Sequence, residues 1–215
     1  MINVYVTMEK FTLGQGFIIE PVRLTVPKDT QASVVITDLL GEGNYKITGS
    51  ITSNFYLASV RDDDTDIDIP EYILKAMNNQ VDKRQSDEWL GEFDYYSMSG
   101  WMYCVNKSFP GIGAAAYKLQ DNDVMSWQFT LYGYGADLGG AGNWGTDNLI
   151  TPADKDDLVR AIADLNASSD IDKILSIKKN RKAFDNGYTA MKNLEATQEQ
   201  VDEATKALKE IEIPS

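Results

Sequence analysis

Five aspartates between residues 62 and 68 form the sharpest chemical cluster in this 215-residue sequence. Their side chains supply the hard oxygen ligands that Ca²⁺ prefers, and their spacing resembles the start of an EF-hand loop. That analogy ends at Ile69, where an EF-hand has its tight-turn glycine, and at Lys75, where it has a glutamate. Two interpretations therefore stay open, a calcium site or a solvated acidic loop that places negative charge before the helix expected after Pro70. The candidate metal ligands are Asp62, Asp64, Asp66 and Asp68.

A second candidate site lies at the end of the aromatic part of the chain. Residues 89–144 hold all four tryptophans, and a glycine-rich loop covers residues 133–145. Aromatic rings in or beside such a loop cannot all face a core, so they are candidates for stacking on a planar ligand or a sugar ring. The loop lacks the features of a phosphate-binding loop, so its glycines are expected to have a structural role. The candidate ligand-binding residues are Tyr132, Tyr134, Asp137 and Trp144.

The composition gives little support for catalysis. The sequence has no histidine, so neither a Ser-His-Asp triad nor a Cys-His pair can be assembled. Glycoside hydrolysis needs only two carboxylates, and 33 acidic residues leave that reaction formally open. The single cysteine, Cys104, is expected to be a small buried group inside a strand rather than a reactive thiol. We expect that the protein is not an enzyme.

Charge and hydropathy exclude two classes of partner. The formal net charge of -13 would repel phosphate backbones and anionic lipids, so we expect no nucleic-acid partner. No apolar run reaches about 18 residues, so we expect no membrane insertion. With 43% hydrophobic residues, the chain is long enough to bury a sizeable core in one or two domains.

Period-two patterns predict strands in the first part of the chain. Met125, Trp127, Phe129 and Leu131 alternate with Ser126, Gln128 and Thr130, which predicts one buried and one wet face. Residues 101–106 alternate in the same way. Residues 3–9 and 17–26 predict an antiparallel hairpin, followed by a helix that ends at residue 40, short strands within residues 45–60 and a helix over residues 71–77.

Helical periodicity replaces the aromatic pattern beyond a boundary near residues 145–151. Thr151 and Pro152 predict a helix start, and the stretch from Thr197 to Gln200 predicts a capping box before a third helix. A middle helix is expected over residues 179–194, with a short turn of helix over residues 171–177 before it. Three helices of this length predict a small three-helix bundle.

Several blocks within residues 1–140 resemble the transcobalamin C-terminal-like domain, a bacterial β-grasp family without an assigned general function. These blocks are residues 16–21, 55–60, 89–95, 99–106, 121–124 and 133–139. The resemblance implies a β-grasp-like mixed sheet with a packed helix over residues 1–147. In the cobalamin carriers that give the family its name, this domain covers one side of a corrinoid and a helical barrel covers the other. The helical residues here are too few for such a barrel. The ligands that we expect for this domain are a corrinoid, a carbohydrate or another small molecule.

The second part of the chain, residues 148–215, resembles a FIVAR-type (found in various architectures) helical module. The residues that carry this resemblance are Ala183, Ala190, Asn193, the stretch 196–204 and Leu208. The pairing of the two modules resembles secreted or wall-displayed proteins of Gram-positive bacteria. It implies an extracellular or cell-wall location after removal of a signal peptide.

The expected fold class is therefore α+β, with a β-grasp-like domain followed by the three-helix bundle. We expect a monomeric, non-enzymatic, extracellular module that binds a small molecule or glycan. The alternative is a structural or adhesive spacer of a cell-surface protein that has no small-molecule ligand. No cofactor is expected other than Ca²⁺ at the acidic loop.

Overall fold

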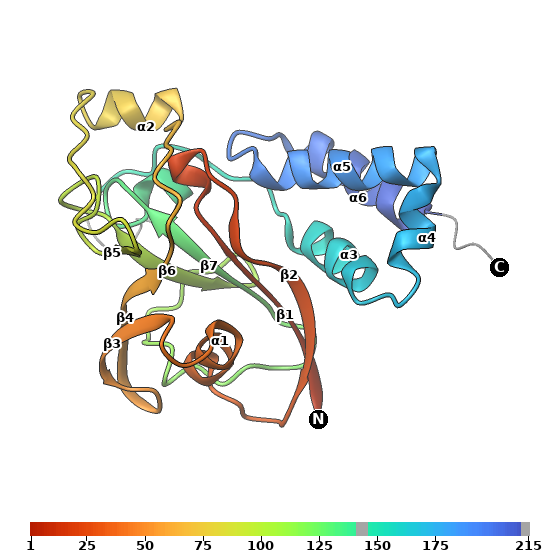
Figure 1. Ribbon diagram of the computed structural model, residues 1–215, viewed down its shortest axis with the longest axis horizontal. Helices are drawn as coiled ribbons and strands as arrows, with labels where there is room; N and C mark the ends of the chain where they lie inside the picture. The colour runs from red at the N-terminus through yellow and green to blue at the C-terminus, as the bar shows by residue number, and fades with distance from the viewer. Residues whose placement is uncertain (141–145, 212–215) are drawn as a thin grey trace.

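The computed structural model describes residues 1–140 and 146–211, and it has an α+β fold. Within these residues there are two β-sheets and six α-helices (Figure 1). The sheets and the first two helices come from the first part of the chain. The other four helices follow one another at its C-terminal end, on one side of the larger sheet.

The larger sheet has four strands in the order β2-β1-β7-β6. They are β1 (Ile2–Glu9), β2 (Phe17–Val26), β6 (Gly100–Val105) and β7 (Val124–Thr130). The predicted hairpin is confirmed, because β1 and β2 are antiparallel. β1 also pairs in parallel with β7, and β6 pairs antiparallel with β7. β1 and β7, the first and the last strand in the described part of the chain, thus lie side by side at the centre of the sheet.

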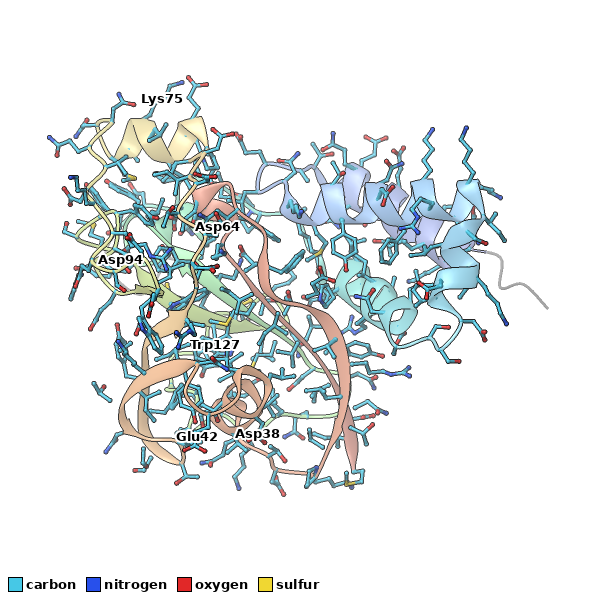
Figure 2. The ribbon with its side chains drawn as sticks, in the orientation of Figure 1. Asp38, Glu42, Asp64, Lys75, Asp94 and Trp127 are labelled. Carbon is cyan, nitrogen blue, oxygen red and sulfur yellow. The ribbon has the colours of Figure 1, made fainter. Side chains whose placement is uncertain are left out.

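One face of this sheet forms the main hydrophobic core. The side chains of Val4, Val6 and Met8 lie on this face together with Met125, Trp127 and Phe129, and all six are buried. The predicted burial of the apolar positions of β7 is therefore confirmed. Figure 2 shows Trp127 in the interior of the molecule, near helix α1 (Ala32–Leu40) in this view. Residues of α1 belong to the same core.

A second, three-stranded sheet closes the other side of this core. Its strands are β3 (Tyr45–Ser50), β4 (Ser53–Arg61) and β5 (Trp89–Gly91), in that order. Phe55, Leu57 and Leu90 point into the core. The short helix α2 (Glu71–Ala76) lies at one end of the molecule, with the labelled Lys75 on its outer side (Figure 2).

The predicted wet face of β7 is wrong, because the C-terminal helices and the loop that contains Asp137 cover it. Thr130 is 2% exposed, and Ser126 and Gln128 are half-buried. Helix α3 (Asp156–Asn166) packs its apolar residues Leu158 and Ile162 on this side of the sheet. A helix distant in sequence thus buries polar side chains that a strand pattern assigns to solvent.

Helix α3 begins later than the sequence suggests. Thr151 and Pro152 precede the helix. The ring of Pro152 lies so close to Gly139 that a Cβ added there would be 2.4 Å from it. This close contact ties the segment to the glycine-rich loop, and the first helical turn forms only at Asp156.

The remaining helices are α4 (Ile171–Ser176), α5 (Lys178–Lys192) and α6 (Gln198–Lys209). The predicted capping box is confirmed, because Thr197 and Gln200 exchange side-chain hydrogen bonds with each other's backbone. The helices also bind the edge strand β2: the Asn166 amide donates to Pro21 O at 3.0 Å, and Arg23 pairs with Asp164 at 2.9 Å. Edge strands covered in this way are protected from pairing with other chains. No helix in the described part of the chain is long and apolar enough to cross a bilayer.

Candidate functional site

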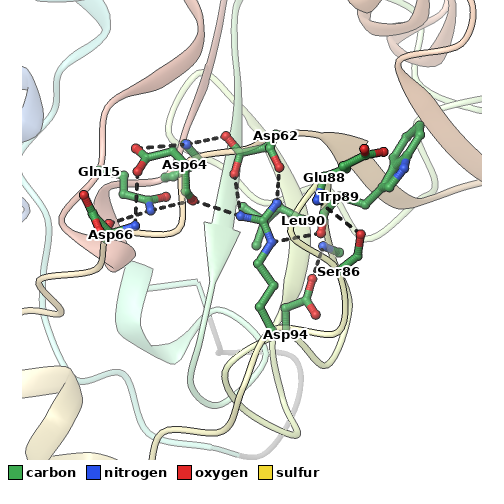
Figure 3. A network of polar contacts seen from close by, with 12 residues as sticks. Gln15, Asp62, Asp64, Asp66, Ser86, Glu88, Trp89, Leu90 and Asp94 are labelled. Carbon is green, nitrogen blue, oxygen red and sulfur yellow. Dashed lines mark hydrogen bonds and ion pairs between the residues drawn. The ribbon is translucent and has the colours of Figure 1, made fainter.

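The acidic loop is organised around one buried carboxylate, that of Asp62. Lys10 Nζ lies 2.6 Å from Asp62 Oδ1, and Arg84 NH1 lies 3.0 Å from Asp62 Oδ2. The three side chains are between 4% and 6% exposed. Arg84 donates further hydrogen bonds to the carbonyl oxygens of Asp62, Asp64 and Trp89, as the dashed lines in Figure 3 show. The cations of the chain itself thus neutralise the acid at the centre of this cluster.

The four candidate metal ligands are not brought together. Asp64, Asp66 and Asp68 are exposed, whereas Asp62 is turned inward to Lys10 and Arg84. Among residues 1–140 and 146–211, no group of three acidic or cysteine side chains could hold a metal ion. The side-chain amide of Gln15 instead holds the backbone of the loop, because it donates to Asp64 O at 2.9 Å and to Asp66 O at 2.7 Å. We did not predict this arrangement from the sequence, because Arg84 belongs to a polar stretch that looks exposed.

The candidate ligand residues of the glycine-rich loop separate into three environments. Tyr134 is exposed, and Tyr132 is half-buried against Tyr96, with ring centroids 6.0 Å apart. Trp144 lies outside the described residues. Asp137 is 0% exposed, so a ligand at the loop surface cannot contact it.

Asp137 has a structural function inside the loop. Its carboxylate accepts hydrogen bonds from the backbone N–H of Leu131 at 2.7 Å and of Tyr132 at 3.0 Å, and from the Thr130 hydroxyl. Burial raises the pKa of Asp137 to about 6, although these hydrogen bonds favour the charged form. The assignment of Asp137 as a ligand-binding residue is thus corrected: it fixes the backbone where β7 ends.

The glycines of this loop permit close packing, as their expected structural role requires. Gly135 has φ +98°, and a Cβ there would lie 2.8 Å from the sulfur of Met102. A Cβ at Gly140 would lie 2.6 Å from the ring of Phe109. Since side chains at these positions would collide with their neighbours, the loop backbone can lie directly against β6 and the segment after it.

Next to this loop lies a large aromatic groove that we did not predict from the sequence. Its volume is about 690 Å³. The walls come from β4, β6, β7 and the segment 109–114, and they include the rings of Phe55, Tyr56, Trp101, Tyr103, Phe109 and Trp127. The rings pack in fixed relative orientations: Tyr103 stacks on Trp127 with centroids 5.3 Å apart, and Phe55 meets Trp127 edge-on at 6.2 Å.

The rim of the groove is apolar and open to solvent. Ile112 is 52% exposed, and Tyr56 is 42% exposed. The Tyr103 hydroxyl donates to Ile112 O at 2.6 Å and so holds the rim segment against the groove wall. A sequence signal for this segment did exist, because an isolated isoleucine between two glycines after a proline indicates an apolar side chain in an exposed turn.

A smaller cavity of about 120 Å³ lies between the covered face of the sheet and the C-terminal helices. Glu9, Gln128 and Cys104 face it from the sheet, and Lys155 and Asp156 face it from the start of α3. Glu9 is 2% exposed and accepts a hydrogen bond from the Gln128 amide at 3.0 Å and one from the Phe11 N–H. Lys155 Nζ donates to the carbonyl oxygens of Met191 and Asn193, both at 2.7 Å.

Burial shifts the pKa values of the groups around this cavity. It raises the pKa of Glu9 to about 7 and that of Asp156 to about 6, and it lowers the pKa of Lys155 to about 8. The predicted burial of Cys104 is confirmed, and burial raises the pKa of its thiol to about 12. A thiol with so high a pKa is almost wholly protonated at neutral pH and is a poor nucleophile.

The central part of the chain is similar to a known family. Residues 72–130 match a family described as a domain of unknown function (DUF4430). A comparison with curated proteins gave no match. The matched span runs from α2 to the end of β7, so it includes β6, the segment 109–114 and Trp127 of the aromatic groove. Over this span, the chain is thus similar to a family that has no assigned function.

Proposed function

We propose that this protein is a non-enzymatic, extracellular binding module that holds a small ring-shaped ligand in the aromatic groove. The groove itself carries the proposal. Its volume of about 690 Å³ lies within the range of roughly 300–1,000 Å³ that is typical of small-molecule sites. Its rings are held in place by stacking and by hydrogen bonds, so most of the groove is already formed before a flat ligand enters.

The chemistry of the lining favours binding over catalysis. Among the described residues, no acidic, basic, serine or threonine side chain lines the groove. A glycosidase would need two carboxylates about 5–10 Å apart on either side of its substrate. The buried carboxylates of Glu9 and Asp137 each accept hydrogen bonds from neighbouring groups of the chain, and neither lines the groove.

Finer assignments of fold and location are part of the same proposal. A β-grasp fold of the transcobalamin C-terminal-like kind is supported by the parallel pairing of β1 with β7 and by α1, which follows the first hairpin. A FIVAR-like three-helix bundle is supported by α3, α5 and α6, with α4 as a short connection. The two resemblances together support an extracellular location in a Gram-positive bacterium, with a corrinoid or a glycan as the first ligands to test.

Intrinsic tryptophan fluorescence tests the proposal, because Trp101 and Trp127 both line the groove. The protein would be titrated with cyanocobalamin and with oligosaccharides of glucose and N-acetylglucosamine. Three proteins would be compared: the unaltered chain, Ile112→Asp at the groove rim, and Tyr134→Ala at the glycine-rich loop. Both altered side chains are about half exposed, so neither substitution disturbs the core.

We expect a saturable response that Ile112→Asp weakens roughly tenfold or more, since it places a charge where the ligand's apolar face would lie. Tyr134→Ala should leave the response unchanged. The reverse pattern would move the site to the glycine-rich loop. A flat response to every ligand would sink the proposal and favour the spacer alternative.

A further inference from the structure

Four polar atoms belong to the aromatic rings of the groove, and three of them have partners within the protein. The Tyr56 hydroxyl donates to Glu92 Oε2 at 2.7 Å, and the Tyr103 hydroxyl donates to Ile112 O at 2.6 Å. Trp101 Nε1 donates to Leu90 O at 3.0 Å. The fourth atom, Trp127 Nε1, has no hydrogen-bond partner in the described part of the chain.

The position of the Trp127 ring is closely fixed by its neighbours. The residue is 3% exposed, and its strand is paired on both sides, with Met8 and Tyr103 as register partners. Tyr103 stacks on the ring, and Phe55 packs against it edge-on. The indole therefore cannot turn to find an acceptor elsewhere without disturbing the core.

Buried polar groups in native proteins nearly always have partners, and each exception needs an explanation, of which a bound external group is one. Five buried side-chain atoms lack a partner within the described residues: Gln15 Oε1, Ser33 Oγ, Tyr95 Oη, Ser99 Oγ and Trp127 Nε1. Of these five residues, only Trp127 lines the groove.

We infer that the ligand of the groove carries an oxygen acceptor that receives the hydrogen bond of Trp127 Nε1, and that Trp127 thereby determines specificity. This inference rests on the proposed function. The groove lining has no charged side chain within the described residues to pair with an ion, and the net charge of -13 repels anions. The ligand class is therefore a ring compound without negative charge that has a carbonyl or similar oxygen at its edge.

Entry of the ligand requires a small movement of one ring. The indole nitrogen is buried beneath its neighbours, and the half-buried Tyr103 is the ring stacked on Trp127. Tyr103 is held by its hydrogen bond to Ile112 O in the exposed rim segment. Displacement of that segment by a ligand frees the Tyr103 ring to tilt and gives the ligand oxygen access to the indole N–H.

Two probes of nearly the same shape separate the hydrogen bond from apolar binding. 1-Indanone carries a carbonyl oxygen on a flat bicyclic ring, and indane is the same ring without it. NMR spectra of ¹⁵N- and ¹³C-labelled protein would follow the indole N–H signals and the methyl signals of Ile112, which report occupancy of the groove. The Trp127 signal is the one absent in Trp127→Phe. If that variant does not fold, Trp89→Phe, Trp101→Phe and Trp144→Phe identify the Trp127 signal by elimination.

We expect both probes to shift the Ile112 methyl signals, and only indanone to move the Trp127 indole proton downfield. Indanone should bind roughly tenfold more tightly than indane, and Trp127→Phe should remove this difference while leaving indane binding within a few-fold. Equal affinities with an unmoved indole proton would overturn the inference and leave the proposed groove intact. No shift at Ile112 with either probe would contradict the groove itself, and the inference with it.

Discussion

Replacing Glu9 by glutamine is expected to stabilise the protein by about 3 kcal/mol near pH 8 and to change its stability little near pH 4.5. The Glu9 carboxyl group is buried between the sheet and the C-terminal helices, and burial raises its pKa from the ordinary 4.5 to about 7. The protonated form is therefore favoured by folding. Glutamine resembles that form at every pH.

The direction of the effect follows from the raised pKa. Stability linked to protonated Glu9 is fully present below about pH 4.5 and is lost as the pH rises through about 7. The difference between the two pKa values corresponds to about 3 kcal/mol. This value already includes the attraction of the Lys155 ammonium group, which lowers the pKa of Glu9 against the larger effect of burial. About 3 kcal/mol is therefore the stabilisation expected for Glu9→Gln near pH 8.

Other groups near Glu9 also make the stability depend on pH, and they do so in the unaltered protein and in Glu9→Gln alike. Asp137 and Asp156 have raised pKa values of about 6, so their stabilisation is also lost as the pH rises, before about pH 7. Lys155 has a lowered pKa of about 8, so the penalty for its burial is relieved only as the pH rises above that value. Cys104 and Lys107 also line the cavity. These groups together are therefore expected to contribute least to the stability of the unaltered protein between about pH 7 and 8.

Glutamine can keep the hydrogen bonds of the site. Its carbonyl oxygen can accept from the Phe11 N–H, and its amide group can donate to Gln128 once the Gln128 amide has rotated. The substitution therefore removes a buried charge and keeps one hydrogen bond to each of these two partners. This distinguishes it from Glu9→Ala, which would also create a cavity.

Urea unfolding at about pH 4.5, 6 and 8 measures the predicted difference. All four tryptophans lie before residue 151, so fluorescence reports on the β part and far-UV circular dichroism reports mainly on the helices. Glu42→Gln, at an exposed position, is the matched control and should show no pH-dependent gain. A difference between Glu9→Gln and the unaltered protein that is the same at all three pH values would refute the reasoning.

Three further substitutions test other parts of the structure. Asp62→Asn should destabilise the protein by about 3 kcal/mol, because it leaves two buried cations without their carboxylate. Asp63→Asn, at an exposed position of the same loop, should change the unfolding free energy by less than about 0.5 kcal/mol, and equal effects would contradict the network. Gly135→Ala should lower stability by about 1–3 kcal/mol, because alanine there meets a positive φ and a neighbouring sulfur 2.8 Å away. Gly16→Ala is the control for Gly135→Ala in thermal unfolding, because a Cβ at Gly16 would meet open space. If both variants lost the same stability, local strain at Gly135 would not be the cause. Thr197→Ala should cost about 1 kcal/mol through loss of the capping box, and unchanged helix melting by circular dichroism would contradict that role.

Local patterns in the sequence were sufficient for the elements and for one face of the main sheet. The alternation around Trp127 predicted a strand whose apolar side chains are buried, and Cys104 was expected inside a strand. The spacing of Thr197 and Gln200 predicted a capping box that the structure contains. These features depend on residues close together in the chain, so a short window of sequence is enough to recognise them.

Only the tertiary structure decided which distant segments meet. Asp62 looked like a calcium ligand because its neighbours are acidic, yet its partners Lys10 and Arg84 lie 52 and 22 residues away. The aromatic groove combines β4, β6, β7 and the segment 109–114, and no single window of sequence contains them all. Glu9 belongs to a face that the strand pattern assigns to water, and it is buried because α3 packs over it. Periodicity shows which side chains point the same way along one strand, whereas the packing of helices and sheets from elsewhere in the chain determines what those side chains meet.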